Sequence, residues 1–277
     1  MNRLKIDFSR RQVMAVINVT PDSFYASSRT ASRAEVIVRV RRALDEGASI
    51  IDIGGYSSRP GADEVPADEE FRRVAEGLRA VRDAAPDAVV SVDTFRADVA
   101  ARCIEAFGPI VVNDISAGAA DSDMWRVVAR YDVPYVAMHM RGTPATMQSM
   151  TDYGDVAGEV ADWLGRRIDA MVAAGIGRSN IIVDPGFGFA KSAGQNFALL
   201  AGLHRICRLG YPVLAGVSRK SMIYRTLGTT PDHALNGTTA LHWECLRQGA
   251  SILRVHDVRE AAETIRLYEE FEKQNDK

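Results

Sequence analysis

Eight short apolar runs, separated by longer amphipathic stretches, limit the possible folds of this sequence more than any other feature. The runs are rich in β-branched residues and show almost no alternation of apolar and polar positions, which is typical of parallel strands buried on both faces. Strands are predicted at 13–18, 49–53, 88–93, 110–114, 134–138, 180–184, 212–216 and 251–255. Helices are predicted between or after them, among others at 32–47, 68–85, 153–174 and 257–273.

A strand followed by a helix, repeated eight times, predicts an α/β fold in which the parallel strands close into a (β/α)8 TIM barrel. An open, doubly wound sheet is the alternative, but such a sheet usually carries a glycine-rich phosphate turn after its first strand. Here the first strand runs into Asn18-Val-Thr-Pro-Asp-Ser-Phe24. Because no linker or low-complexity stretch interrupts the 277 residues, we predict a single domain over residues 1–277.

The composition argues against several classes of protein. Lys and Arg number 34 against 36 Asp and Glu, so a broad nucleic-acid-binding face is not expected. The three cysteines, Cys103, Cys207 and Cys245, are odd in number and lack CxxC spacing, which argues against a disulfide framework or a zinc site. No apolar run is long enough for a signal peptide or a membrane-spanning helix, so we expect a cytoplasmic protein without a membrane partner.

Polar residues gather at or just after the ends of the predicted strands. They are Asn18, Asp52, Asp93, Asn113 with Asp114, His139, Asp184, Lys220, and Arg254 with His256. A barrel brings the carboxyl ends of its strands to one rim, where barrel active sites lie. Any one of these residues could instead cap the next helix, but capping does not require Lys220, Arg254 or His256. Asp52 lies inside its strand, and we interpret it as a structural hydrogen-bond acceptor.

The chemistry of these side chains predicts the kind of ligand. Asp93, Asn113 and Asp184 suit a flat heterocycle that is rich in N–H donors and ring acceptors. Asn18 offers a neutral oxygen that Mg2+ accepts as a ligand, with phosphate oxygens completing the shell. The residues that suit an anion, and a phosphate group in particular, are Arg59, Lys220, Arg254 and His256. The pocket is therefore predicted to hold a heterocycle attached to a phosphate.

Eight segments, taken in order along the chain, resemble the dihydropteroate synthase family. They are NVTPDSF (18–24), GGYSSRPGA (54–62), SVDTF (91–95), VNDIS (112–116), MHMRGTPATMQ (138–148), VDPGFGFAK (183–191), GVSRKSMI (216–223) and RVHDV (254–258). Each string alone is a weak signal, whereas eight in the family order are a strong one. The resemblance covers essentially the whole chain.

The resemblance implies an activity and its reactants. Members of this family are (β/α)8 barrels, usually homodimers, and act as transferases in folate biosynthesis. They condense 6-hydroxymethyl-7,8-dihydropterin diphosphate with p-aminobenzoate to give 7,8-dihydropteroate and pyrophosphate. Mg2+ is the implied cofactor, and sulfonamides compete for the aminobenzoate position.

The resemblance also assigns roles to individual residues. The implied pterin contacts are Asp93, Asn113, Met138, Asp184, Lys220 and Arg254. The implied diphosphate contacts are Asn18 through Mg2+, Ser58, Arg59, Arg254 and His256. The implied aminobenzoate contacts are Phe24, Pro60, Phe189 and Ser221. The residues expected to act in catalysis are Asp93, Lys220, Arg254 and Arg59.

Two loops depart from the common form of the family. The second loop has Tyr56 and Ser58 where the family usually has Glu and Thr, and Tyr25 follows the first loop where the family usually has Ser. Two other functions remain as alternatives: a pterin-binding methyltransferase that serves a corrinoid protein, and a non-catalytic pterin-binding paralogue. The methyltransferase has no need for a diphosphate pocket, and the paralogue predicts loss of the basic residues that are present here.

Overall fold

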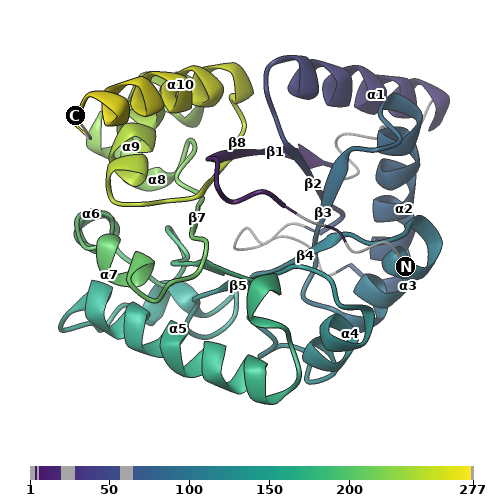
Figure 1. Ribbon diagram of the computed structural model, residues 1–277, viewed down its shortest axis with the longest axis horizontal. Helices are drawn as coiled ribbons and strands as arrows, with labels where there is room; N and C mark the ends of the chain where they lie inside the picture. Colours follow the sequence, from purple (N-terminus) through teal and green to yellow (C-terminus); the bar gives the residue numbers. More distant parts are fainter. Residues whose placement is uncertain (1–3, 5, 20–28, 57–64, 276–277) are drawn as a thin grey trace.

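The structure is a computed structural model that describes residues 4, 6–19, 29–56 and 65–275. Parallel strands form a ring at its centre (Figure 1). They are β1 (Gln12–Asn18), β2 (Ile50–Gly54), β3 (Val89–Asp93), β4 (Val111–Asp114), β5 (Tyr135–Met138), β6 (Ile181–Asp184), β7 (Leu214–Ala215) and β8 (Ile252–Val255). Each predicted strand is present, with bounds that differ from the prediction by no more than two residues.

The sheet closes on itself. The hydrogen-bonded order is β6-β5-β4-β3-β2-β1-β8-β7, in which β8 returns to pair with β1. The remaining gap is bridged by a parallel pairing of Val183, in β6, with Val213, just before β7. The predicted (β/α)8 TIM barrel is therefore confirmed, and the open doubly wound sheet is wrong.

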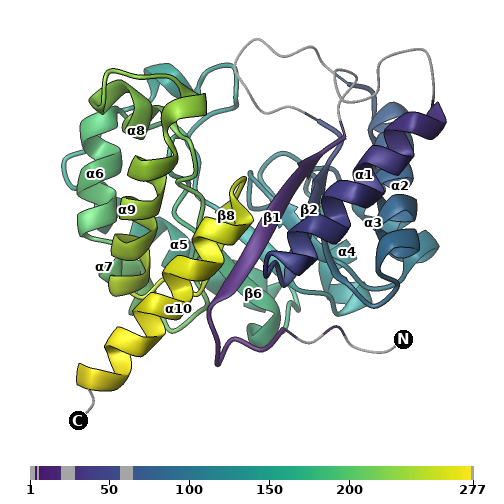
Figure 2. The same ribbon diagram turned by 90° about the horizontal axis from the view of Figure 1, so that it is seen from above.

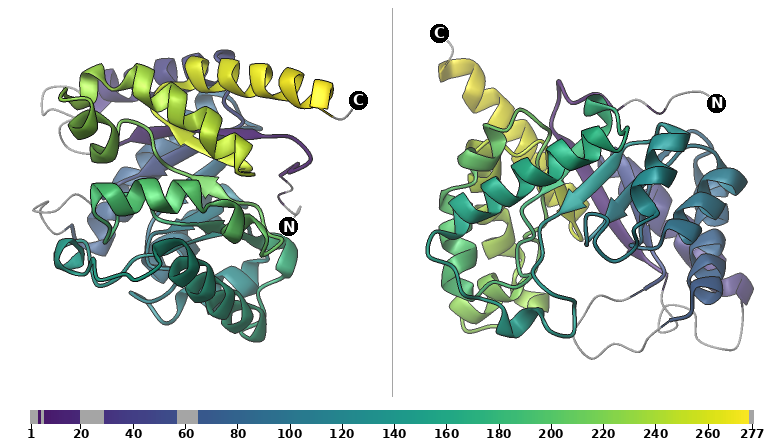
Figure 3. Two further views of the ribbon diagram at one scale, coloured as in Figure 1. Left: turned by 90° about the vertical axis from the view of Figure 1, so that its left-hand side faces the viewer. Right: turned by 90° about the horizontal axis from the view of Figure 1, so that it is seen from below.

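Helices cover the outside of the ring on all sides, as Figures 2 and 3 show from further directions. The longer ones are α1 (Arg29–Asp45), α2 (Ala67–Ala84), α3 (Ala97–Phe107), α4 (Met124–Tyr131), α5 (Val156–Ala173), α6 (Ala193–Ala201), α9 (Leu235–Arg247) and α10 (Val258–Asn275). Shorter helical segments are η2 (Met147–Ser149), η3 (Arg178–Asn180), α7 (His204–Cys207), α8 (Ser221–Thr226) and η4 (Pro231–His233). In the described part of the chain, no helix is long and apolar enough to cross a membrane.

Two apolar cores hold the barrel together. The larger core lies between the strands and the surrounding helices. The smaller core is formed by one side chain from each of several strands: Met14, Ile50, Val111, Val136, Ile182, Leu214 and Ile252. Leu4, Ile6 and Phe8 pack against this second core. Successive residues of a strand point to opposite faces of the sheet. The residue two positions after each member of the smaller core therefore also points into the barrel.

Candidate active site

A polar layer lies directly above the smaller apolar core. Asp52, Asn113, Asp184 and Arg254 each follow a residue of that core by two positions, so their side chains point into the barrel toward its carboxyl end. Asp52, Asn113 and Asp184 are buried, with 1%, 4% and 7% of their surface exposed. The closed ring brings together Asp52 and Arg254, which lie 202 positions apart in the chain.

Arg254 is held between two carboxylates. Its Nε donates to Asp52 Oδ2 at 2.8 Å, and its Nη2 lies 2.7 Å from Asp52 Oδ2 and 2.8 Å from Asp93 Oδ2. Burial opposes its charge, but the two carboxylates raise the pKa of Arg254 above its usual value. Burial raises the pKa of Asp93, with Asp52 adding to the effect and Arg254 opposing it. One cation thus balances the buried Asp52 and the half-buried Asp93, which fixes the guanidinium in place.

Asp52 has a larger part in this network than its sequence position indicated. Besides the bonds from Arg254, its carboxylate oxygens lie 3.4 and 3.5 Å from Asn113 Nδ2. The interpretation of Asp52 as a hydrogen-bond acceptor agrees with this geometry. The sequence did not indicate that its donors are two of the residues expected to bind the pterin.

Asn18 and Asp93 lie at the ends of two strands that flank Gly54, at the end of β2. Asn18 pairs with Gly54 across β1 and β2, and Gly54 pairs with Asp93 across β2 and β3. A Cβ on Gly54 would lie 3.5 Å from Asp93 Cβ and 3.8 Å from Asn18 Oδ1, so the missing side chain leaves a small open space between them. Asn18 is exposed at this rim. A neutral amide oxygen beside open space fits one ligand position of Mg2+, if phosphate oxygens supply the others.

No protein-only metal site is present in the described ranges. Within them, no group of three or more His, Cys, Asp and Glu side chains has an arrangement that holds a metal ion. A divalent cation at Asn18 would therefore depend on ligands from a bound phosphate compound.

Lys220 and Asp184 influence each other electrostatically. Burial lowers the pKa of Lys220 to about 8, Asp184 opposes this effect, and Arg254 adds to it. Burial raises the pKa of Asp184, whereas Lys220 is the strongest influence that lowers it. Lys220 also donates a hydrogen bond to the carbonyl of Phe187. This half of the site therefore holds an acid and a base whose charges depend on each other.

Apolar surface flanks Lys220. Its Nζ lies 4.9 Å from the centre of the half-buried Phe189 ring, and Ser221 begins α8 immediately after it. Met138 is buried at the end of β5 and pairs in register with Asp184. The predicted pterin residue Met138 thus lies beside Asp184, and the predicted aminobenzoate residues Phe189 and Ser221 lie beside Lys220.

His256 is held by Ser218, which the sequence analysis did not single out. Ser218 Oγ accepts the backbone N–H of His256 at 3.2 Å and lies 2.9 Å from His256 Nδ1. Because Ser218 Oγ already accepts the backbone N–H of His256, we assign its own proton to the contact with Nδ1, which then acts as the acceptor. The ring proton is then on Nε2, which leaves an N–H donor on the exposed edge of His256.

A second contact fastens the same two loops together. Arg219 forms a two-pronged ion pair with Asp257, at 2.8 Å from Nε and 2.7 Å from Nη2. It also donates to the carbonyls of Pro231 and Asp232. Arg219 adopts a left-handed backbone conformation, with φ of 53°. The pair therefore fixes the relative positions of Lys220, which follows Arg219, and His256, which precedes Asp257. The only sequence signal for this ion pair is that Arg219 and Asp257 lie within the segments 216–223 and 254–258.

Two residues of the predicted polar set do not face the site. Asp114 lies next to Asn113 on β4 and so points to the opposite side of the sheet, where it accepts from Ser116, Gly118 and Tyr135. His139 packs edge-on against Trp163 at 5.0 Å. The expectation that these two converge with the others is wrong, because strand alternation directs them outward.

Several predicted residues lie outside the described ranges. They are Phe24, Ser58, Arg59 and Pro60, together with the loop departure at Tyr25. Tyr56 is described: its ring meets Phe95 edge-on at 5.3 Å and lies 5.7 Å from the Arg96 guanidinium. Arg96 also pairs with the buried Glu70. At this position the tyrosine thus has an aromatic and a cationic partner.

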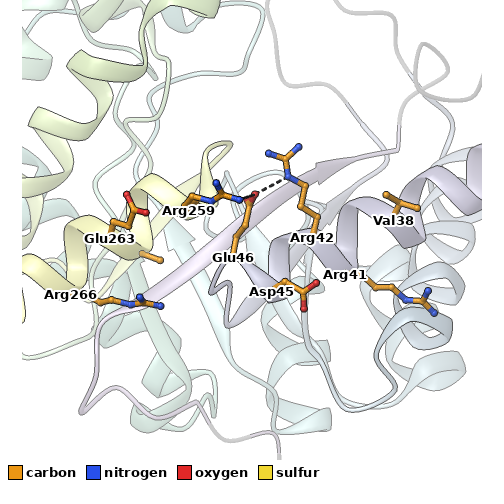
Figure 4. A pocket seen from close by; sticks show the side chains of 9 residues that line it. Val38, Arg41, Arg42, Asp45, Glu46, Arg259, Glu263 and Arg266 are labelled. Carbon is orange, nitrogen blue, oxygen red and sulfur yellow. Dashed lines mark hydrogen bonds and ion pairs between the residues drawn. The ribbon is translucent and has the colours of Figure 1, made fainter.

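A groove of about 730 Å³ on the outer surface is separate from the site (Figure 4). It lies between α1 and α10, and its charged residues are Arg41, Arg42, Asp45, Glu46, Arg259, Glu263 and Arg266. Glu46 pairs with Arg42 at 2.8 Å and with Arg259 at 3.5 Å. None of the predicted site residues lines this groove, so it belongs to the packing of two outer helices.

Comparisons with known proteins agree with this geometry. The family model described as pterin binding enzyme matches residues 14–256. A dihydropteroate synthase of Haemophilus influenzae is 40% identical over 97% of this chain and 96% of its own length. A Xanthomonas albilineans dihydropteroate synthase solved with 4-aminobenzoic acid superposes with a TM-score of 0.87 at 38% identity, covering 96% of this chain and 94% of that one. A Yersinia pestis dihydropteroate synthase solved with a sulfonamide drug gives 0.90 at 36% identity, covering 98% of each chain.

The barrel, the polar residues at its carboxyl end and the similarity to known enzymes agree: the chain belongs to the dihydropteroate synthase family of pterin-binding enzymes.

Proposed function

We propose that this chain is a transferase that joins 6-hydroxymethyl-7,8-dihydropterin diphosphate to p-aminobenzoate and releases pyrophosphate. The observation that carries the proposal is the meeting of two sets of side chains at one end of the barrel. One set, Asp93, Asn113 and Asp184, suits a heterocycle, and the other, Lys220, Arg254 and His256, suits an anion. The related enzyme from Xanthomonas albilineans, solved with 4-aminobenzoic acid, supports the choice of aryl amine.

In this proposal the pterin ring lies over the polar layer inside the barrel. The ring N–H and amino groups donate to Asp93 and Asp184, and Asn113 provides both a donor and an acceptor. Met138 contributes an apolar wall, while Lys220 and Arg254 complete the pocket. Because Asp52 and Asp93 hold the guanidinium of Arg254, it is already oriented before a ligand arrives.

The leaving diphosphate lies nearer the rim, toward Asn18 and His256. Arg254 and the Nε2–H of His256 are the described donors for its oxygens, and Ser58 and Arg59 are proposed to join them. Mg2+ at Asn18 would neutralise charge on the departing pyrophosphate. The described side chains hold the anion in place, which stabilises the charge that develops as the carbon–oxygen bond breaks.

The chemical step needs no covalent enzyme intermediate. The bond between the pterin methylene carbon and the diphosphate oxygen breaks, and its electron pair leaves with the pyrophosphate. The electron-rich reduced ring delocalises the positive charge left on the methylene carbon, and Asp93 with Asp184 stabilises that charge. The aniline nitrogen then forms the new carbon–nitrogen bond and loses a proton to water.

The aryl amine is a modest nucleophile that needs positioning more than activation. Phe189 and Ser221, with Phe24 and Pro60, are proposed to form its pocket beside Lys220. Among all these residues we assign the catalytic roles to Asp93, Lys220, Arg254 and Arg59. A cytoplasmic location, a single domain and a homodimer stay predictions.

Pyrophosphate release by the purified protein tests this function. The reaction is run with dihydropterin diphosphate, p-aminobenzoate and Mg2+, and then with each of them omitted in turn. Release that depends on all three supports the proposal. Methyl transfer from a reduced folate without pyrophosphate release would instead favour the methyltransferase, and pterin binding without either reaction would favour the non-catalytic paralogue.

A further inference from the structure

Lys191 is a buried lysine that the reaction described above does not use. It follows the turn after β6 and is 5% exposed. Its Nζ lies 2.9 Å from the carbonyl of Gly186, 2.9 Å from the carbonyl of Phe189 and 3.1 Å from His139 Nδ1. An ammonium group has three protons and accepts none, so these three acceptors use all of its donors.

His139 is suited to be the third acceptor. Because a lysine ammonium only donates, Nδ1 of His139 is unprotonated and the ring proton is on Nε2. Burial, with smaller contributions from the charges of Lys191 and Arg141, lowers the pKa of His139 to about 3. The imidazole is therefore neutral, and it is wedged edge-on against Trp163.

The turn that Lys191 holds is built from unusual backbone conformations. Gly186, Gly188 and Ala190 have φ of 69°, 82° and 50°. A Cβ on Gly186 would lie 2.0 Å from the carbonyl oxygen of His139, so only glycine fits there. Ala190 has no such freedom and keeps its left-handed conformation because the surrounding contacts impose it. Lys191 is the next residue, and it binds two carbonyls of the turn.

The same turn connects two parts of the proposed site. At its start, the N–H of Gly186 donates to Asp184 Oδ1 at 2.7 Å, which orients the carboxylate. At its other end it presents the Phe189 ring 4.9 Å from Lys220 Nζ. Gly186 thus bonds the Asp184 side chain through its N–H and Lys191 through its carbonyl.

Building on the proposed function, we propose that Lys191 is a positioning residue for both substrates. It holds the turn from Pro185 to Ala190 so that Asp184 keeps its place against the pterin and Phe189 keeps its place against the aryl amine. Its buried positive charge also acts on the Asp184 carboxylate.

The electrostatics agree with this assignment. Lys191 is among the groups that lower the pKa of Asp184 against the effect of burial. In return, Asp184 opposes the lowering of the pKa of Lys191, which burial brings to about 7 and to which Lys220 and Arg141 contribute. Removing the ammonium therefore both frees the turn and favours protonation of a pterin-binding carboxylate.

The test compares two substitutions of Lys191 with a control of the fold. Lys191→Met keeps the length of the side chain and removes its donors, and Lys191→Arg restores a charge and donors. Ile104→Ala, in the fully buried part of α3, lowers stability away from the turn. Calorimetry gives the affinity for dihydropterin diphosphate, steady-state kinetics give KM for p-aminobenzoate, and thermal unfolding gives the stability of each variant.

We expect Lys191→Met to raise both the pterin dissociation constant and KM for p-aminobenzoate about tenfold or more, because hydrogen bonds from a charged group are lost. Lys191→Arg should recover part of both, and Ile104→Ala should change neither. Lys191→Met with unchanged substrate constants, and reduced stability like the control, would overturn the inference. If the wild-type protein makes no dihydropteroate, the proposed function fails, whereas the pterin affinities still test Lys191.

A milder pair of variants applies if Lys191→Met does not fold. His139→Asn keeps an acceptor near the position of Nδ1, and His139→Leu removes it. We expect a loss of pterin affinity and a higher KM for His139→Leu, with smaller changes for His139→Asn. Equal constants in the two variants would contradict the role of Lys191 in holding the turn.

Discussion

Replacing Asp52 with asparagine removes one charge from the interior of the barrel with little change in shape. The Asp52 carboxylate accepts from Arg254 Nε at 2.8 Å, from Arg254 Nη2 at 2.7 Å and from Asn113 Nδ2 at 3.4 Å. An amide offers only one oxygen, and its NH2 group would face a donor. The fork of Arg254 therefore loses part of its support, although Asp93 remains as a second partner.

The size of the effect follows from these contacts. A hydrogen bond that involves a charged group contributes about 1.5–3 kcal/mol, and leaving a buried charge without its partner costs about 3–5 kcal/mol. Since the asparagine keeps one acceptor and Asp93 still pairs with Arg254, we expect the lower range, about 2–3 kcal/mol. At about 1.4 kcal/mol for each factor of ten, kcat/KM for the pterin diphosphate should fall about 30- to 140-fold.

Asp114→Asn is a matched control. Asp114 is as fully buried as Asp52 and accepts hydrogen bonds from Ser116, Gly118 and Tyr135, but it points away from the barrel interior. Denaturant unfolding should show a loss of stability in both variants, whereas only Asp52→Asn should lower kcat/KM and pterin affinity. If Asp52→Asn loses stability and keeps the kinetics of the wild type, the network supports the fold and not the site.

Three further substitutions or conditions test other parts of the site. Ser218→Ala removes the donor to His256 Nδ1, so nitrogen NMR should show a mixture of imidazole tautomers and kcat should fall. A single, unchanged tautomer would refute the assignment of the His256 ring proton to Nε2. Gly186→Ala places a carbon 2.0 Å from the His139 carbonyl and should lower the melting temperature, which an unchanged value would contradict. Burial lowers the pKa of Lys220 to about 8, so its charge is present below that pH and lost above it. The kcat/KM of the wild type should therefore decline above pH 8. Lys220→Arg stays charged and should lack that decline, and a decline of the same size in this variant would contradict the role of Lys220.

The strands were predictable because strands that are buried on both faces have uninterrupted runs of apolar, β-branched residues. The prediction was least accurate at β7, which is hydrogen-bonded as a strand only over Leu214–Ala215 rather than 212–216. Its neighbour β6 pairs there through the single bridge of Val183 to Val213. How far a strand pairs depends on both neighbours in the closed ring, and a local pattern does not contain that information.

The polar residues at the strand ends were predictable as a set, but their directions were not. Asn113 and Asp114 are adjacent and equally polar, and only the alternation counted from Val111 in the inner core shows that Asn113 faces inward. The pairing of Asp52 with Arg254 joins residues 202 positions apart, so it depends on closure of the ring. Ser218 carried no signal of its own beyond its place in a motif.

Pterin affinity of Asp184→Asn tests the central claim most directly, since Asp184 lies 7% exposed in the polar layer proposed to receive the ring. Calorimetry with dihydropterin diphosphate and Mg2+ is carried out on the wild type and the variant, with thermal unfolding as a check that both are folded. We expect binding about tenfold weaker or worse, because a neutral amide replaces a charge-assisted acceptor. Equal affinity in a folded variant would mean that the pterin does not bind at the carboxyl ends of these strands.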